Sequence, residues 1–254
     1  MKTAILRQVS SSLGRCELTH LEREPIDVDV ARAQHSEYER LLASLGCSIV
    51  LLPEEPELPD AVFVEDVAVV LPELAIITRP GAPSRRPEVP SIAAALARFR
   101  RLVTIQPPGT IDGGDVLVVG KTLFIGETRR SNGHAIEQIA RLLHPLGYAV
   151  RGVPVSGCLH LKSAATLCSA ETLLVNPAWV DPSFFGGSSI LEVHPSESSA
   201  ANALLLGGGV VYPVSFPRTG ERLRSRGVVV YDIDLSELAK AEGAVTCCSL
   251  IVET

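Results

Sequence analysis

The sequence lacks the features by which nucleic-acid-binding and membrane proteins are usually recognised. Its formal net charge is −6, so it offers no excess of basic side chains to neutralise nucleic-acid phosphates. The same acidic balance disfavours docking on an anionic membrane surface. No stretch approaches the run of about 20 apolar residues that a membrane-spanning helix needs. We therefore expect neither a nucleic acid nor a membrane as a partner.

A secretory leader and a disulfide framework are also missing. The apolar stretch at the N-terminus is interrupted at Arg7, which leaves it too short for the core of a signal peptide. The six cysteines are scattered, and none of them form a CxxC pair. Disulfide frameworks are typical of small secreted domains, whereas a chain of 254 residues can bury a large core. We expect six free thiols in a cytoplasmic protein.

No segment rich in glycine, serine or proline divides the chain. The proline-rich segment 52–59 is short and typical of a surface loop. We therefore expect a single domain over residues 1–254. Short apolar runs rich in β-branched residues recur along it and are bounded by Pro, Gly or Asp, which predicts strands. Examples are the runs 48–52, 75–78, 116–119 and 228–231.

Apolar residues at helical spacing predict helices between these strands. The clearest are residues 29–45 and a second stretch that begins at a Ser131 or Asn132 cap and ends at Gly147. Weaker helical patterns cover 90–101, 218–226 and 236–241.

The predicted elements do not alternate strictly. Strands 117–119 and 123–125 are joined by the tight-turn pair Gly120-Lys121, and a helix and the strand 149–153 follow. Such a strand–strand–helix–strand order recurs at roughly fifty residues, a period that suits propeller blades. No repeat in the sequence accompanies it, so this α/β chain could also form a doubly wound sheet.

Two acidic segments stand where strands meet loops. The first, 60–66, is predicted to be an otherwise apolar strand that ends in Glu65-Asp66. Its two adjacent carboxylates are costly to bury unless a cation pairs with them. A guanidinium would suit them, because it pairs with carboxylates through parallel hydrogen bonds. The second segment, 110–115, places a glycine pair between Asp112 and Asp115, which allows close backbone approach and positive φ. A solvent-facing strand end and a plain hairpin turn remain the simpler interpretations, and the glycine run 207–209 is interpreted as a turn.

Two further segments carry a histidine and a pair of cysteines. His160 lies between two leucines and is either a core residue or a general acid and base. Cys247 and Cys248 would point to opposite faces of a strand, so that one can face a pocket while the other packs. Zinc binding is disfavoured because no CxxC spacing accompanies them. Together, the four segments supply a nucleophile, an acid and base, and carboxylates, as a covalent hydrolase requires.

The chain resembles the dimethylarginine dimethylaminohydrolase, or dimethylargininase, family of the guanidino-group-modifying (pentein) superfamily. The likeness runs from the first strand to the C-terminus and rests on several motifs in one order. These motifs are Phe63-Val64-Glu65-Asp66, Ile77-Thr78-Arg79-Pro80-Gly81, Ser84-Arg85-Arg86, Ile111-Asp112-Gly113-Gly114-Asp115, Leu159-His160-Leu161-Lys162, Ala200-Ala201-Asn202 and Thr246-Cys247-Cys248-Ser249.

The resemblance implies a five-bladed α/β propeller of strand–strand–helix–strand (ββαβ) modules around a central pocket. It implies hydrolysis of asymmetric dimethylarginine or monomethylarginine to citrulline, with release of dimethylamine or methylamine. No cofactor and no catalytic metal are expected. The partner is a small guanidino compound, and a homodimer is possible because exposed propeller faces could pair.

Carried onto this chain, the resemblance implies that Cys247 is the nucleophile, that His160 is the general acid and base, and that Asp112 orients the histidine. The substrate-binding positions that it implies are Glu65 and Asp66 beside the guanidinium, Arg85 and Arg130 at the α-carboxylate, Asp60 and the carbonyl of Leu18 at the α-ammonium, and Ala241. Cys248 is assigned to packing.

Several alternatives stay open at this point. A related hydrolase could act on free arginine or agmatine, although arginine deiminases carry an acid two residues after the histidine, where this chain has Lys162. An amidinotransferase is disfavoured because those chains are usually longer. From other classes, the chain could be an inactive guanidine-binding protein or a zinc- or redox-responsive thiol protein.

The acidic surroundings also predict the state of the nucleophile. Carboxylates at Glu65, Asp66 and Asp112 would disfavour a nearby thiolate and raise the pKa of Cys247. A cationic substrate would reverse that effect. We therefore expect Cys247 to be mostly a thiol in the free enzyme and to ionise when substrate binds.

Overall fold

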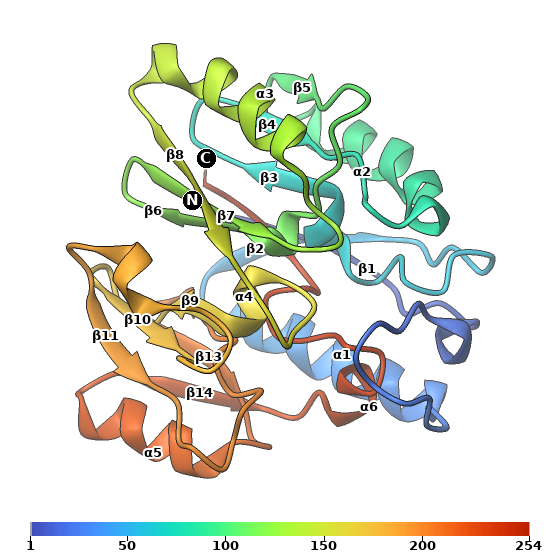
Figure 1. The fold of residues 1–254 in the computed structure, drawn as a ribbon. Helices are drawn as coiled ribbons and strands as arrows, with labels where there is room; N and C mark the ends of the chain where they lie inside the picture. Colours follow the sequence, from blue (N-terminus) through green and yellow to red (C-terminus); the bar gives the residue numbers. More distant parts are fainter. Residues whose placement is uncertain (1, 254) are drawn as a thin grey trace.

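The computed structural model describes residues 2–253, whose strands form five separate three-stranded sheets (Figure 1). In spatial order the strands of these sheets are β15–β1–β2 (Leu250–Glu253, Lys2–Arg7, Cys47–Leu52), β3–β4–β5 (Ala68–Val70, Ala75–Ile77, Leu102–Thr104), β6–β7–β8 (Val116–Val119, Thr122–Glu127, Ala149–Pro154), β9–β10–β11 (Ala165–Leu167, Thr172–Val175, Ser189–Glu192) and β12–β13–β14 (Leu204–Leu206, Gly209–Pro213, Val230–Ile233).

All five sheets share one pairing pattern. The central strand is antiparallel to the strand before it and parallel to the strand after it. A parallel pair needs a long crossover, which is usually a helix. Four crossovers are α1 (Val28–Ser44), α2 (Val89–Leu96), α3 (Gly133–Leu143) and α5 (Pro217–Ser225), whereas the fourth module uses only the 3-10 turn Pro182–Phe185.

The first module joins the two ends of the chain. Strand β15 pairs antiparallel with β1, which brings Lys2 opposite Glu253. The five modules therefore form a closed ring, and the fold is the five-bladed α/β propeller and not a doubly wound sheet. The modules share topology without sharing sequence, which is why no sequence repeat marks them.

Local signals in the sequence placed α1 and α5 to within one residue at each end, whereas α2 ends at Leu96 and not at 101 as predicted. Asp27 caps α1 by accepting hydrogen bonds from the backbone N–H groups of Asp29 and Val30. Asn132, and not Ser131, caps α3, and the following 3-10 turn ends at Gly147 with φ of 78°. The fifth module differs from expectation because its last strand starts at Val230 and not at 228.

Apolar cores lie between the helices and the sheets of the modules. In the first module Tyr38 and Leu42 of α1 are fully buried, and in the third Ile139 and Leu143 of α3 are fully buried. None of the described helices is long and apolar enough to cross a membrane. All six cysteines are free thiols, as the sequence predicted.

Candidate active site

Each module begins with a short polar turn that leads into its first strand. The turns are η2 (Val64–Val67) before β3, η4 (Gly113–Asp115) before β6, α4 (Leu161–Ala164) before β9, residues 200–203 before β12 and residues 245–249 before β15. Hydrogen bonds between these turns bring together groups that are far apart in the sequence. The ring closure thus assembles the predicted reactive segments in one place.

Two of the predicted strands are wrong at this point. The segment around Glu65-Asp66 is a 3-10 turn, in which the N–H of Asp66 donates to the carbonyl of Phe63. Cys247 and Cys248 lie in a turn before β15, not on the strand. Their apolar neighbours are buried against the cores of adjoining modules, so the run of hydrophobic residues indicated burial and not strand pairing.

His160 is held between two carboxylates. Its Nε2 lies 3.1 Å from Asp112 Oδ2, and its Nδ1 lies 3.7 Å from Asp66 Oδ1. The other oxygen of Asp112 accepts the backbone N–H of Gly81 at 2.9 Å, which fixes the carboxylate. His160 therefore belongs to a buried group of charged side chains and is not packed against apolar residues alone.

The glycine pair Gly113-Gly114 makes this approach possible. A Cβ at Gly114 would lie 2.6 Å from Nδ1 of His160, and a Cβ at Gly113 would lie 2.0 Å from the carbonyl oxygen of Glu65. Neither glycine adopts a positive φ. The pair therefore serves close approach, and the predicted left-handed backbone is not used.

Cys247 and Cys248 divide as predicted, although not by strand alternation. Cys248 is fully buried in the core of the first module, while Cys247 is only partly buried and faces the cavity that His160 lines. Burial, followed by the charges of Glu65 and Asp66, raises the pKa of Cys247 well above its ordinary value. This direction agrees with the predicted thiol, although Asp112 is not among the causes.

The histidine shifts the opposite way from what burial alone would give. Burial lowers the pKa of His160, but the charges of Asp66, Asp112 and Asp115 and the hydrogen bond to Asp112 outweigh it and raise this pKa to about 9. At neutral pH the free site thus pairs an imidazolium with a thiol. The imidazolium can donate a proton, and the thiol needs a positive charge beside it before it can ionise.

A small cavity gathers most of the predicted site residues. Those that line it are Cys247, His160, Asp60, Asp66, Arg85, Arg130 and Ala241, together with Glu17, Phe63, Leu159 and Glu242, to which the sequence analysis gave no role. Three predicted residues do not line it. Asp112 is fully buried and bonds to His160, Glu65 lines a different cavity together with Lys162 and Thr246, and Leu18 lies in the loop 17–23.

Arg85 is a fully buried cation with several partners. It forms ion pairs with Asp66 and Glu88, and Nη2 also donates to the carbonyls of Asp60 and Phe63 at 3.1 and 3.0 Å. Burial would lower its pKa, but Glu88 and Asp66 raise it well above the ordinary value. Arg85 therefore stays charged and fixes the carboxylate of Asp66 beside His160.

The loop of residues 17–23, here called the entrance loop, is mostly exposed and bonds to residues that line the cavity. Arg130 Nη2 donates to Thr19 Oγ1 at 3.0 Å, and the N–H of Glu17 donates to both oxygens of Asp60. The carboxylate of Glu242 accepts the backbone N–H groups of Thr19, His20 and Leu21 at 2.5–3.1 Å. Glu242 is the one described non-glycine residue with a positive φ, at 58°.

Asp115 is a buried carboxylate that organises two parts of the site. Its oxygens accept the N–H of Leu161, beside His160, at 2.9 Å and the hydroxyls of Thr128 and Ser131 at 2.7 and 2.5 Å. Thr128 in turn accepts the N–H of Arg130 at 3.1 Å. Burial raises the pKa of Asp115 to about 6, although these hydrogen bonds oppose the shift. The Asp-Gly-Gly-Asp spacing was the signal that could have assigned it.

One group of side chains has a spacing that could hold a metal ion. Ligand atoms of Asp66, Asp112 and His160 lie within 4.8 Å of one another. Each residue already takes part in an ion pair or hydrogen bond with a protein group, with Arg85, Gly81 and Asp112 among the partners. The polar atoms of these three residues thus already have partners within the chain. Cys247 and Cys248 belong to no metal-binding group in the described part of the chain.

Comparison with known proteins decides the family. Over 251 residues the chain is 39% identical to an N(G),N(G)-dimethylarginine dimethylaminohydrolase of Streptomyces coelicolor, covering 98% of this chain and 96% of that protein. The chain belongs to the dimethylarginine dimethylaminohydrolase family. A second dimethylarginine dimethylaminohydrolase, from Pseudomonas aeruginosa, is 37% identical and covers 87% of this chain and 89% of its own length. No family model matches the chain.

Solved structures agree with this family. A mutant of the Pseudomonas aeruginosa dimethylarginine dimethylaminohydrolase, complexed with citrulline, superposes with a TM-score of 0.93 at 35% identity and covers 98% of both chains. The N-terminal domain of ArgZ, an arginine dihydrolase of cyanobacteria, superposes with a TM-score of 0.89 at 19% identity and shows the fold alone.

Proposed function

We propose that the chain hydrolyses Nω-methylated arginines to citrulline and releases methylamine or dimethylamine, with Cys247 as the nucleophile. The observation that carries this proposal is the shared cavity of Cys247, His160 and Asp66, in a chain of this family. A thiol, an imidazolium and a fixed carboxylate are what substitution at a guanidinium carbon requires. No redox cofactor takes part in this scheme.

The first half of the reaction forms a covalent intermediate. Asp66 holds the guanidinium plane, and the positive charge of the substrate lowers the pKa of Cys247, so that the thiol releases its proton to solvent and the thiolate attacks the guanidinium carbon. His160, protonated up to about pH 9, donates a proton to the departing amine. Positioning of this kind can remove about 7–11 kcal/mol from a barrier in the best cases.

The second half releases citrulline. The S-alkylthiouronium on Cys247 is attacked by a water molecule that the now neutral His160 deprotonates. The C–S bond breaks, the thiol is restored and the water oxygen becomes the ureido oxygen of citrulline. Asp112 keeps His160 oriented in both halves, because its carboxylate is itself held by Gly81.

The remainder of the substrate is bound at the entrance. We propose that Arg130 binds the α-carboxylate, with Arg85 contributing its charge, and that Asp60, the Leu18 carbonyl and Ala241 receive the α-ammonium. All but Leu18 line the cavity, and Leu18 lies between Glu17 and Thr19, both of which contact site residues. Glu65 acts from beneath the Cys247 turn by its charge and its hydrogen bonds.

A hydrolase of unsubstituted arginine is the second candidate, and Lys162 argues against it. Its Nζ lies 2.5 Å from Glu65 Oε1 beneath the site, a partner that an acid at this position would repel. The test is citrulline release from asymmetric dimethylarginine, monomethylarginine and arginine at equal concentrations. Citrulline from the methylated substrates at a kcat/KM well above that for arginine supports the proposal, and the reverse order contradicts it.

The proposal extends to the domain organisation, the cellular location and the oligomeric state of the protein. We propose a single functional domain over residues 1–254, since β15 and β1 join the two ends. We also propose a cytoplasmic homodimer. Cell fractionation and sedimentation of the purified protein give the location and the mass.

A further inference from the structure

The motif Ala200-Ala201-Asn202 has no role in the reaction as described above. Its asparagine nevertheless lies in the turn at which the other modules carry reactive residues. Asn202 stands in the turn before the first strand of its module, β12. In the other four modules, the corresponding turns carry Cys247, Glu65-Asp66, Asp112 and His160. Asn202 is thus the polar residue that the remaining module contributes to the centre of the ring.

The side-chain amide of Asn202 is buried and fully bonded. Its Oδ1 accepts the backbone N–H of Thr246 at 3.1 Å, and its Nδ2 donates to Thr246 Oγ1 at 3.0 Å and to the carbonyl of Lys162 at 3.1 Å. Only 5% of the residue is exposed. Rotating the amide by 180° would set a donor against the Thr246 N–H, so its orientation is fixed.

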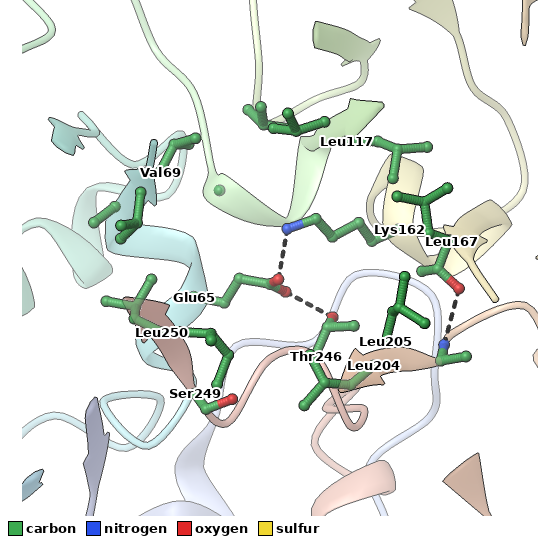
Figure 2. Close-up of a pocket in the computed structure, with 18 residues that line it drawn as sticks. Glu65, Val69, Leu117, Lys162, Leu167, Leu204, Leu205, Thr246, Ser249 and Leu250 are labelled. Atoms are coloured by element: carbon green, nitrogen blue, oxygen red, sulfur yellow. Dashed lines mark hydrogen bonds and ion pairs between the residues drawn. The ribbon is translucent and has the colours of Figure 1, made fainter. Parts of the chain in front are cut away.

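These bonds connect the two halves of the catalytic pair. Thr246 is the residue before Cys247, and Lys162 follows His160 by two residues. Thr246 Oγ1 also donates to Glu65 Oε2 at 2.7 Å, and the N–H of Glu65 donates to the carbonyl of Cys247 at 3.1 Å. Figure 2 shows Lys162, Glu65 and Thr246 in one bonded row.

The row also separates the site from a second cavity. Glu65, Lys162 and Thr246 line a cavity of about 230 Å³ that contains neither Cys247 nor His160. The Cys247 turn thus has open space on one side and the reaction cavity on the other. Val245 and Cys248 anchor the turn in the core of the first module, while the buried side chain of Thr246, which stands between the two cavities, is held by hydrogen bonds to Asn202 and Glu65.

We propose that Asn202 is a positioning residue for the nucleophile: by joining Thr246 to Lys162, its amide sets the place of Cys247 relative to His160. The proposal rests on Cys247 and His160 acting as described under the proposed function. A small displacement of a reacting group can lower a rate about 100-fold, so loss of this amide should act on kcat.

The test uses the isosteric change Asn202→Asp, which sets a carboxylate oxygen against the carbonyl of Lys162. Asn176 offers a matched control, because it is also buried and its Nδ2 donates to a carbonyl, that of Ser198, at 2.7 Å. Asn202→Asp should lower kcat by about 10- to 100-fold and leave KM within about threefold. Asn176→Asp should keep kcat within about threefold at a comparable loss of thermal stability.

A second pair of variants covers the case in which Asn202→Asp does not fold. Thr246→Val removes the hydroxyl that joins Asn202 to Glu65 and should lower kcat, while Thr246→Ser keeps the hydroxyl and should restore it. The proposal is overturned if Asn202→Asp retains the wild-type kcat. It is equally overturned if Asn176→Asp loses kcat by the same factor, or if Thr246→Val turns over like Thr246→Ser.

A thiol-specific measurement separates this proposal from the proposed function. The pH dependence of Cys247 alkylation by iodoacetamide needs no substrate turnover. Asn202→Asp should move the alkylation profile to higher pH, because a carboxylate beside the Cys247 turn disfavours the thiolate, whereas Asn176→Asp should leave it unchanged. An unchanged profile in Asn202→Asp contradicts the proposal, while a wild-type protein that releases no citrulline contradicts only the function.

Discussion

The Cys247 turn and the entrance loop face the same cavity, but they are held in different ways. The Cys247 turn is bonded to Glu65 of the second module, and through Thr246 to Asn202 of the fifth, mostly by buried groups. The entrance loop is exposed, with Leu21 half exposed, and one carboxylate, that of Glu242, takes three of its N–H groups. Several buried hydrogen bonds thus fix the position of Cys247, whereas the position of the entrance loop depends mainly on its exposed backbone and the carboxylate of Glu242.

The largest effect should come from the nucleophile itself. Cys247→Ser replaces a thiol by a hydroxyl that no group in the cavity can ionise, so citrulline release should fall by at least about 10⁴-fold. Cys168→Ser is the control, because Cys168 is a buried thiol that does not line the cavity. Turnover by Cys247→Ser within tenfold of the wild type would remove this residue from the mechanism.

The next effect concerns the residue that orients the histidine. Asp112→Asn keeps the shape of the side chain but removes the charge that helps to hold the proton on His160. We expect kcat to fall by about 10²–10⁴-fold, as for loss of acid–base catalysis. The high-pH limb of the profile should also move to lower pH. A variant with the wild-type profile would show that Asp112 does not act through His160.

The pH profile of the wild-type protein tests the state of the free site. Because the pKa of His160 is raised from 6.5 to about 9, the imidazolium persists through neutral pH and loses its proton as the pH rises through 9. The value of kcat/KM, which reports the free enzyme, should therefore fall above about pH 9. A fall that begins near pH 6.5 would mean that the surrounding carboxylates do not hold the proton.

The smallest effect should appear at the entrance loop. Glu242→Gln removes the negative charge that accepts the N–H groups of Thr19, His20 and Leu21. Binding should weaken by several-fold in KM with kcat little changed, because only the loop is loosened. Glu22→Gln makes the same charge change in the same loop.

Hydrogen exchange gives the structural readout for Glu242. The amides of Thr19, His20 and Leu21 should exchange faster in Glu242→Gln than in Glu22→Gln. Equal exchange in the two variants would contradict the role of Glu242 in holding the loop.

The fold was predictable from the sequence where short-range signals were strong. Asn132 and Gly147 mark the ends of the third helical segment, and the tight turn Gly120-Lys121 gives the first hairpin of that module. The closure of the ring was not predictable in this way, because β1 and β15 are separated by almost the whole chain. It followed from the family resemblance, which the comparisons confirm.

Part of the candidate site could be predicted from residue type alone. Cys247, His160 and Asp112 carry chemistry by their residue type, so a motif with these residues attracts an assignment. Asn202, Asp115 and Glu242 act through hydrogen bonds to backbone groups of distant turns, and only the folded chain shows those partners. Glu65 was expected to line the pocket, but its carboxylate instead bonds to Lys162 and Thr246.

The central claim is that Cys247 attacks the guanidinium carbon. Mass spectrometry of the protein quenched during turnover of a slow guanidino substrate, followed by peptide mapping, tests it most directly. The account predicts a single adduct, with the mass of the amidino-bearing amino acid after loss of the amine, on the peptide that contains Cys247. An adduct on Cys158 or Cys248, or turnover without any adduct under conditions that trap the intermediate, would contradict it.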